Sequence, residues 1–131
     1  MSGTASPLLT MTQTTPTVLW NDSADLDELR QSISYGGVGA TCNPVIGYTT
    51  IKQHKDIWGP RIQAIAAANP TWGESEIGWQ AIKDMSVEAA ELLLPIFEET
   101  KGRNGRLSVQ TDPRHHRDAK ALADQAEEFH N

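Results

Sequence analysis

The first hydrophobic run of the chain covers residues 17–20 and reads TVLW, with no polar position after its threonine. A short β-branched and apolar run of this kind is typical of a strand that is buried on both faces. Residues 1–16 before it are rich in Ser, Thr and Pro and show no hydrophobic period. We therefore expect residues 1–16 to form a flexible leader and the folded part to cover residues 17–131.

A three-to-four-residue hydrophobic period begins after Ser23 and predicts an amphipathic helix, with acidic residues in the first turn that favour the helix dipole. The apolar positions of this helix are Leu26, Leu29 and Ile33. The next segment, residues 36–42, reads GGVGATC and predicts a second strand whose small side chains allow close packing. The pair Asn43-Pro44 ends this strand.

The rest of the pattern predicts further helices and a third strand. Residues 45–68 are helical in character, and residues 76–101 predict one or two helices that Pro95 should kink or break. Residues 106–110 alternate between polar and apolar positions like a third strand, and residues 118–129 predict a closing helix. The order strand, helix, strand, helices, strand, helix is typical of an α/β fold built from parallel βα units.

Polar side chains follow each predicted strand at its carboxyl end. Asp22 follows the first strand, Asn43 follows the second, and Gln110 and Asp112 lie at the end of the third. The loops after the carboxyl ends of parallel strands carry the chemistry of such folds, so we expect these side chains to converge on one face. Two other interpretations remain open: Asp22 could cap the helix after it, together with Ser23, and Asn43 could be a turn residue before proline.

The chain has 131 residues, of which 38% are hydrophobic, and this is typical of one soluble domain. No apolar run approaches the roughly 18 residues of a membrane-spanning helix, and residues 1–10 do not resemble a signal peptide, so we expect a cytoplasmic protein without a membrane partner. The net charge of −6 argues against nucleic-acid binding. The single cysteine, Cys42, excludes an internal disulfide and a multi-cysteine metal site, and we expect it to be buried.

Two further motifs have both a functional and a structural interpretation. Residues 37–39 begin like a dinucleotide-binding fingerprint, but Cys42 stands where the third glycine is needed. His115 and His116 lie beside two arginines and could bind phosphate or metal, but adjacent histidines point in different directions on a helix. The structural interpretation is favoured for both motifs.

Three motifs occur together in the order found in one enzyme family. They are WNDSADLDEL at residues 20–29, GATCNP at residues 39–44 and GRLSVQTDPR at residues 105–114. With these motifs, residues 15–131 resemble the N-terminal part of a transaldolase. The resemblance implies part of a TIM (β/α)8 barrel, about the first three strands with their helices, and a mechanism without cofactor or metal. In that mechanism a lysine forms a Schiff base with a ketose phosphate and passes a dihydroxyacetone unit to another sugar phosphate of the pentose phosphate pathway.

The resemblance also implies roles for individual residues. Asp22 matches the acid/base aspartate that handles the sugar hydroxyl proton during cleavage, and Asn43 matches the asparagine that hydrogen-bonds the dihydroxyacetone unit. Thr41, in the same motif as Asn43, is a second candidate for substrate binding. Gln110 stands where typical transaldolases have a glutamate that activates the catalytic water. An amide can orient a water but cannot exchange a proton, and glutamine at this place is similar to the fructose-6-phosphate aldolase branch.

The family has the Schiff-base lysine on the fourth strand and the phosphate-binding residues later still, so we expect both beyond residue 131. The lysines of this chain fall in helical or turn patterns; they are Lys52, Lys55, Lys83, Lys101 and Lys120. We therefore expect the 131 residues alone to be inactive toward sugar phosphates. The alternatives are a non-catalytic fragment that self-associates or acts as an interaction module, and a separately encoded C-terminal chain that completes the site.

Overall fold

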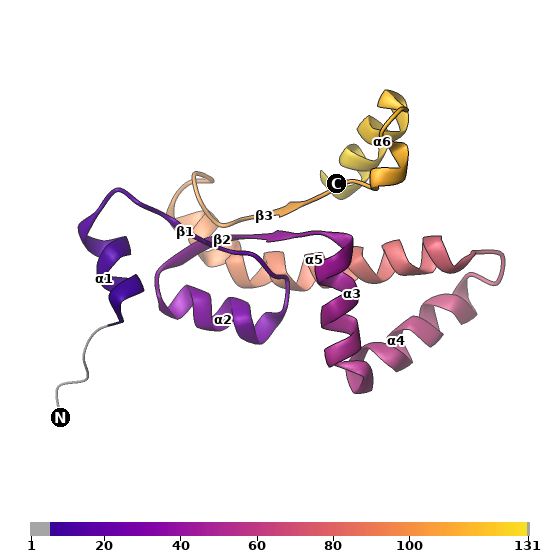
Figure 1. Ribbon diagram of the computed structural model, residues 1–131, viewed down its shortest axis with the longest axis horizontal. Coiled ribbons are helices and arrows are strands. Elements are labelled where there is room, and N and C mark those ends of the chain that lie inside the picture. The colour runs from indigo at the N-terminus through magenta and orange to yellow at the C-terminus, as the bar shows by residue number, and fades with distance from the viewer. Residues whose placement is uncertain (1–5, 131) are drawn as a thin grey trace.

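Three parallel strands form one sheet in the computed structural model, which describes residues 6–130. The strands are β1 (Leu19–Asn21), β2 (Gly37–Cys42) and β3 (Arg106–Val109). They lie in sequential order, with β2 between β1 and β3 and both neighbouring pairs parallel. Helices follow every strand (Figure 1), so the expected α/β fold with parallel strands is confirmed.

The helices that connect the strands lie on the lower side of the sheet in Figure 1, whereas the last helix lies above the end of β3. The helices after β1 are α2 (Leu26–Ser34), α3 (Pro44–Gln53), α4 (Lys55–Ala68), α5 (Glu74–Glu99), the short 3-10 helix η1 (Pro113–His115) and α6 (Ala119–His130). Among residues 6–130, no helix combines the length and the apolar composition that crossing a membrane requires.

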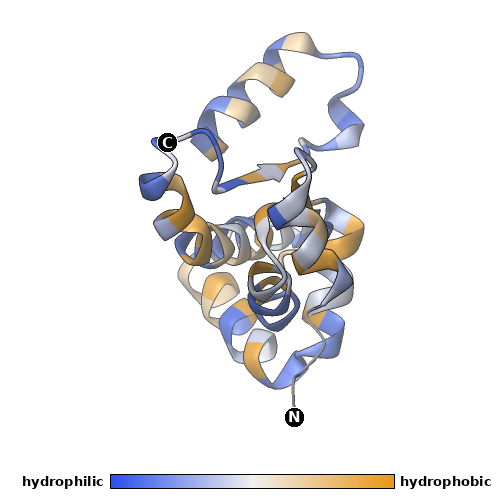
Figure 2. Cartoon of the chain, turned by 90° about the vertical axis from the view of Figure 1, so that its left-hand side faces the viewer, coloured by the Kyte–Doolittle hydropathy of each residue, from blue (hydrophilic) through white to orange (hydrophobic). Residues whose placement is uncertain are grey.

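The hydrophobic core lies between the sheet and helices α2, α4 and α5. Ala40 and Cys42 of β2 are buried in it. The buried helical residues that they meet are Leu29, Trp58, Met85, Ala89 and Leu93. Figure 2 shows hydrophobic and hydrophilic bands alternating along the helices of the chain, which is typical of helices that bury one face. The expected burial of Cys42 is confirmed, and this burial raises the pKa of its thiol.

Strand β1 is more exposed than the sequence predicted. It covers Leu19–Asn21 rather than residues 17–20, and Trp20 is 40% exposed. The indole of Trp20 lies over its ladder partner Gly39, where a Cβ atom would be 2.5 Å from the ring. The helices pack against the opposite face, which carries Ala40. The expectation of a strand buried on both faces is therefore wrong, although the expected close packing of the small residues in β2 is confirmed.

The helices differ from the sequence predictions at two places. Helix α5 is one helix of 26 residues that includes Pro95, so the alternative of a break at this proline is wrong. Pro95 has no N–H group to donate to the carbonyl of Glu91 four residues earlier. Because Glu91 and Pro95 are both exposed, water can bond to this carbonyl instead. The helical region of residues 45–68 divides at His54, whose backbone angles (φ −113°, ψ 50°) are not helical.

The leader predicted for residues 1–16 contains a helix, α1 (Pro7–Thr14). Pro7 occupies the first turn, where its missing N–H costs no helical hydrogen bond. The hydroxyls of Thr10 and Thr14 donate to carbonyl groups four residues earlier, and Thr12 lies against Gly36 at the end of α2. The sequence did not predict this helix at Pro7–Thr14, and the expected flexibility of residues 1–16 stays a prediction. Residues 1–5 lie outside the described residues, so the prediction stands untested there.

Candidate active site

The carboxyl ends of the three strands lie along one side of the sheet, which we call the edge that carries the candidate residues. Each strand is followed there by a residue that the sequence analysis named. Asp22 comes directly after β1, Asn43 comes directly after β2, and Gln110 comes directly after β3. Because all three strands are parallel, their carboxyl ends meet at this edge. The structure therefore brings these three positions together, as expected.

The register of the sheet sets which face these side chains share. Asn21 pairs with Ala40, so Asp22 is level with Thr41, and Thr41 pairs with Ser108. Gln110 lies two residues after Ser108 and therefore follows the same face, because side chains alternate along a strand. This is the face that helices α2 and α5 do not cover.

Asp22 and Thr41 are in direct contact. Oδ1 of Asp22 accepts a hydrogen bond of 2.5 Å from Oγ1 of Thr41. Asp22 does not cap α2, because that position belongs to Asp25, whose Oδ1 accepts hydrogen bonds from the backbone N–H groups of Asp27 and Glu28. The capping interpretation of Asp22 is therefore wrong, and its exposed carboxylate remains accessible to a ligand.

Asn43 is the N-cap of α3 rather than a simple turn residue. Its Oδ1 accepts hydrogen bonds from the backbone N–H groups of Val45 (2.9 Å) and Ile46 (3.0 Å). Pro44 at the first helical position supports the same helix start. Since the amide oxygen is occupied by the cap, the group that Asn43 can offer to a ligand is its Nδ2 donor.

Gln110 is held by its backbone. Its N–H donates to the carbonyl of Cys42 (3.1 Å), which continues the pairing of β3 with β2 by one residue. Its side chain is exposed, and within residues 6–130 no hydrogen bond joins it to Asp22, Thr41 or Asn43. The four candidates thus share one edge, but only Asp22 and Thr41 touch.

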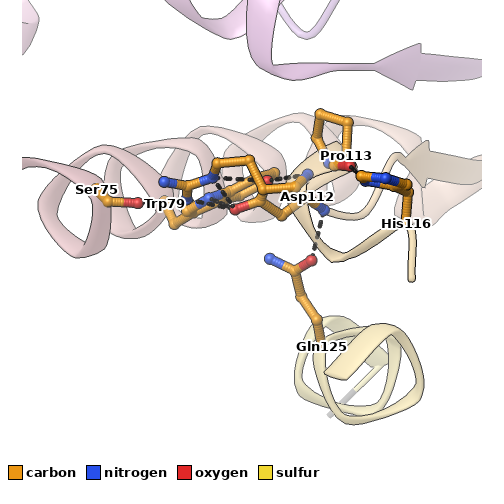
Figure 3. A network of polar contacts seen from close by, with 7 residues as sticks. Ser75, Trp79, Asp112, Pro113, His116 and Gln125 are labelled. Atoms are coloured by element: carbon orange, nitrogen blue, oxygen red, sulfur yellow. Dashed lines mark hydrogen bonds and ion pairs between the residues drawn. The ribbon is translucent and has the colours of Figure 1, made fainter. Parts of the chain in front are cut away.

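Asp112 does not converge with the other candidates, which corrects the expectation from the sequence. Its side chain is 2% exposed and points toward α5 instead (Figure 3). There Oδ2 accepts a hydrogen bond from Nε1 of Trp79 (2.9 Å), and both carboxylate oxygens accept from the guanidinium of Arg114. These hydrogen bonds from Arg114, together with its charge, hold the pKa of Asp112 well below its usual range. This network holds residues 112–114 against α5 after the end of β3.

A second polar pair lies away from the strand ends and carried no signal in the sequence. Nε2 of His54, between α3 and α4, is 2.7 Å from Oδ2 of the capping residue Asp25. The two residues are 29 positions apart in the sequence, and His54 lies outside the three sequence motifs. This contact joins the start of α2 to the end of α3, behind the two loops that carry Asp22 and Asn43.

A cavity of about 190 Å³ opens beside Asp22, between α2 and α3. Its lining includes the hydroxyls of Thr49 and Thr50, the carboxylate of Glu28 and the amide of Gln53. Within residues 6–130, no three His, Cys, Asp or Glu side chains are grouped so as to hold a metal ion. The polar side chains of this lining are groups that can form hydrogen bonds.

The comparisons with known proteins agree with the three sequence motifs. The family model described as Transaldolase/Fructose-6-phosphate aldolase matches residues 19–131. "Transaldolase 2" of Streptomyces avermitilis is 34% identical over 92 residues, which cover 70% of this chain and 24% of that protein. "Transaldolase" of Kocuria rhizophila is 30% identical over 130 residues, which cover 88% of this chain and 34% of that protein.

The chain thus spans between a quarter and a third of the length of these curated relatives. The match to the family model runs from the first strand to the last residue, and it includes every candidate at the strand ends. The resemblance noted in the sequence is confirmed: the chain belongs to the transaldolase/fructose-6-phosphate aldolase family.

Proposed function

We propose that this chain supplies the acid/base and substrate-binding residues for transfer of a dihydroxyacetone unit between sugar phosphates. The observation that carries the proposal is the shared edge of the sheet, where Asp22 is hydrogen-bonded to Thr41 beside Asn43 and Gln110. Membership of the family supports the same conclusion. A carboxylate next to donors of hydrogen bonds is the combination that proton transfer on a sugar hydroxyl requires.

Each residue has a distinct part in the proposed reaction. The carboxylate of Asp22 takes the hydroxyl proton of the bound ketose as the adjacent C–C bond breaks, and it returns the proton when the new bond forms. Thr41 orients that carboxylate through its hydroxyl. The Nδ2 group of Asn43 donates to an oxygen of the dihydroxyacetone unit, because its amide oxygen already caps α3. Gln110 orients a water molecule by hydrogen bonding.

The proposed mechanism needs a lysine nucleophile, and we propose that polypeptide outside these 131 residues provides it. Lys83 is paired with Glu128, and Lys120 is paired with Asp124. Lys52 and Lys55 are exposed on α3 and α4, far along the helices from the strand ends. Lys101 lies in the turn before β3, at the opposite edge of the sheet. None of these amines lies where Asp22 and Asn43 could act on a Schiff base.

The same reasoning leads us to propose that the sheet continues as a (β/α)8 barrel. The order β1-β2-β3, with a helix after each parallel strand, is the order in which such a barrel begins. The open edges of β1 and β3 are then sites for further strands, from a C-terminal extension, a complementing chain or a second copy. Light scattering of the 131-residue chain tests the last of these cases, because a monomer of 14.4 kDa would contradict self-association.

A second candidate function is cleavage of fructose 6-phosphate without efficient transfer, and Gln110 is the observation that favours it. A carboxylate at this position can exchange a proton with a bound water, whereas an amide can only orient the water. Gln110→Glu should therefore raise transfer relative to cleavage. An unchanged ratio would show that position 110 does not decide between the two activities.

The proposal is tested in a chimera in which residues 19–131 replace the matching segment of the Kocuria rhizophila protein. We expect the chimera to be trapped by borohydride with fructose 6-phosphate, whereas the 131-residue chain alone is not. Asp22→Asn should lower kcat of the chimera by at least about a hundredfold. The matched control is Asp27→Asn, an exposed carboxylate on α2 that pairs with Arg30. Equal activity of the two variants would overturn the role of Asp22.

A further inference from the structure

We propose that Asp112 is a positioning residue that fixes Gln110 at the edge of the sheet. The importance of this position for the reaction rests on the function proposed above. The positioning itself follows from the contacts around Asp112. No sequence motif assigns this role, and Asp112 is too deeply buried to touch a substrate.

The carboxylate of Asp112 joins the loop after β3 to helix α5. Nε1 of Trp79 donates to Oδ2 at 2.9 Å, across 33 residues of sequence. The backbone N–H of Arg114 donates to Oδ1 (2.9 Å), and Nε of Arg114 is 3.0 Å from Oδ1 and 2.9 Å from Oδ2. Nη2 of Arg114 also donates to Asp112 and to Ser75 at the start of α5. A buried carboxylate with this many donors is held in one orientation.

The backbone of Asp112 is fixed as well. Its N–H donates to Oε1 of Gln125 on α6 at 2.6 Å (Figure 3). Helix α6 also contacts α5 directly, through the T-shaped pair of the Phe129 and Trp79 rings and through the ion pair of Glu128 with Lys83. Asp112 is therefore the point at which the loop, α5 and α6 meet.

Gln110 lies between two fixed points. On one side its own N–H is bonded to the carbonyl of Cys42 in β2. On the other side only Thr111 separates it from Asp112, and two residues span no more than about 7 Å. Gln110 therefore cannot leave the edge of the sheet while both attachments hold. This restriction matters more for an amide than for a carboxylate, because an amide acts only through the direction of its hydrogen bonds.

The first test measures hydrogen exchange of the 131-residue chain and needs no activity. In Asp112→Asn we expect the amide of Gln110 to exchange at least about tenfold faster, while the amides of Ala89 and Leu93 keep their rates. The matched control is Asp118→Asn, which makes the same change of charge at the exposed cap of α6 and keeps a capping side chain. An equal rise at Gln110 and Leu93 would mean a loss of overall stability and would overturn the proposal, as would an unchanged Gln110.

Trp79→Phe provides a second variant in case Asp112→Asn does not fold. It removes one of the donors to Asp112 and keeps an aromatic ring, so the rise at Gln110 should be smaller but in the same direction. The absence of any rise at Gln110 in this variant would count against the positioning role.

The second test is a double-mutant cycle in the active chimera. Asp112→Asn should lower kcat about tenfold with little change in KM when Gln110 is present, and should have no further effect after Gln110→Ala. A loss of the same size in both backgrounds would overturn positioning through Gln110. Faster exchange at Gln110 together with an inactive chimera would leave the positioning intact and count against the proposed function.

Discussion

The hydroxyl of Thr41 donates a hydrogen bond of 2.5 Å to the carboxylate of Asp22, and this bond joins the ends of two neighbouring parallel strands. Asp22 is exposed, whereas Thr41 is half-buried. The contact sets the direction in which the carboxylate presents its remaining lone pairs.

Thr41→Val removes this hydroxyl and keeps the shape of the side chain. We expect the free energy of unfolding to change by less than about 1.5 kcal/mol, because Asp22 can bond to water instead. In the chimera kcat should fall about tenfold because the carboxylate loses its orientation. Thr41→Ser keeps the hydroxyl and should retain most of the activity. Similar kcat values for the valine and serine variants would contradict the orienting role.

Asp25→Ala removes both the N-cap of α2 and the contact with His54. Each lost interaction is worth about 1 kcal/mol, so the free energy of unfolding should fall by about 2 kcal/mol in urea titrations. Asp27→Ala is the control on the same helix turn, and its exposed pair with Arg30 should contribute less than about 1 kcal/mol. A larger loss for Asp27→Ala would show that the cap has been assigned to the wrong residue.

Leu93 and Leu94 are neighbours on α5 with opposite environments, since Leu93 is 0% and Leu94 is 49% exposed. Leu93→Ala should lower the free energy of unfolding by about 2–5 kcal/mol, because it leaves a cavity beneath the sheet. Leu94→Ala should change it by less than about 1 kcal/mol. Thermal or urea unfolding of the two variants checks the prediction, and equal losses would contradict the orientation of α5.

The low pKa of Asp112 predicts a loss of stability in acid. The unfolded chain binds a proton at the ordinary Asp pKa of about 3.9, whereas the folded protein keeps the carboxylate ionised at lower pH. The contribution of Asp112 is therefore fully present above that range and falls as the pH decreases below it. Urea titrations between pH 5 and 2.5 should show a smaller slope for Asp112→Asn than for the native chain. Parallel curves would contradict the assignment.

The strands and their order could be predicted from the sequence because polar residues follow each apolar or alternating run. Asp22, Asn43 and Gln110 are visible as strand ends for this reason, and parallel pairing places them together. The helix of Pro7–Thr14 was not predicted, because it has no clear hydrophobic period and its contact with the end of α2, a hydrogen bond from the Thr12 hydroxyl to the carbonyl of Tyr35, spans 23 residues of sequence.

The directions of individual side chains could not be predicted from the sequence either. From the sequence, Asp112 is another acidic residue after the end of a strand. In the structure its carboxylate accepts a hydrogen bond from Trp79, 33 residues earlier, and therefore points toward α5. His54 meets Asp25 only because α3 and α4 return to the start of α2. Trp20 belongs to an apolar run that predicted a buried strand, but its ring packs over Gly39 on the face of the sheet that no helix covers. Each case depends on a partner that is distant in sequence.

The indole of Trp79 donates a hydrogen bond to the carboxylate of Asp112 and forms a T-shaped pair with the ring of Phe129. Its ultraviolet absorption and fluorescence should therefore report on the docking of α6 without an added label. The difference spectrum between the native chain and Trp79→Phe isolates the signal of Trp79 from the signals of the other tryptophans. This contribution to the spectrum should change when α6 separates from α5.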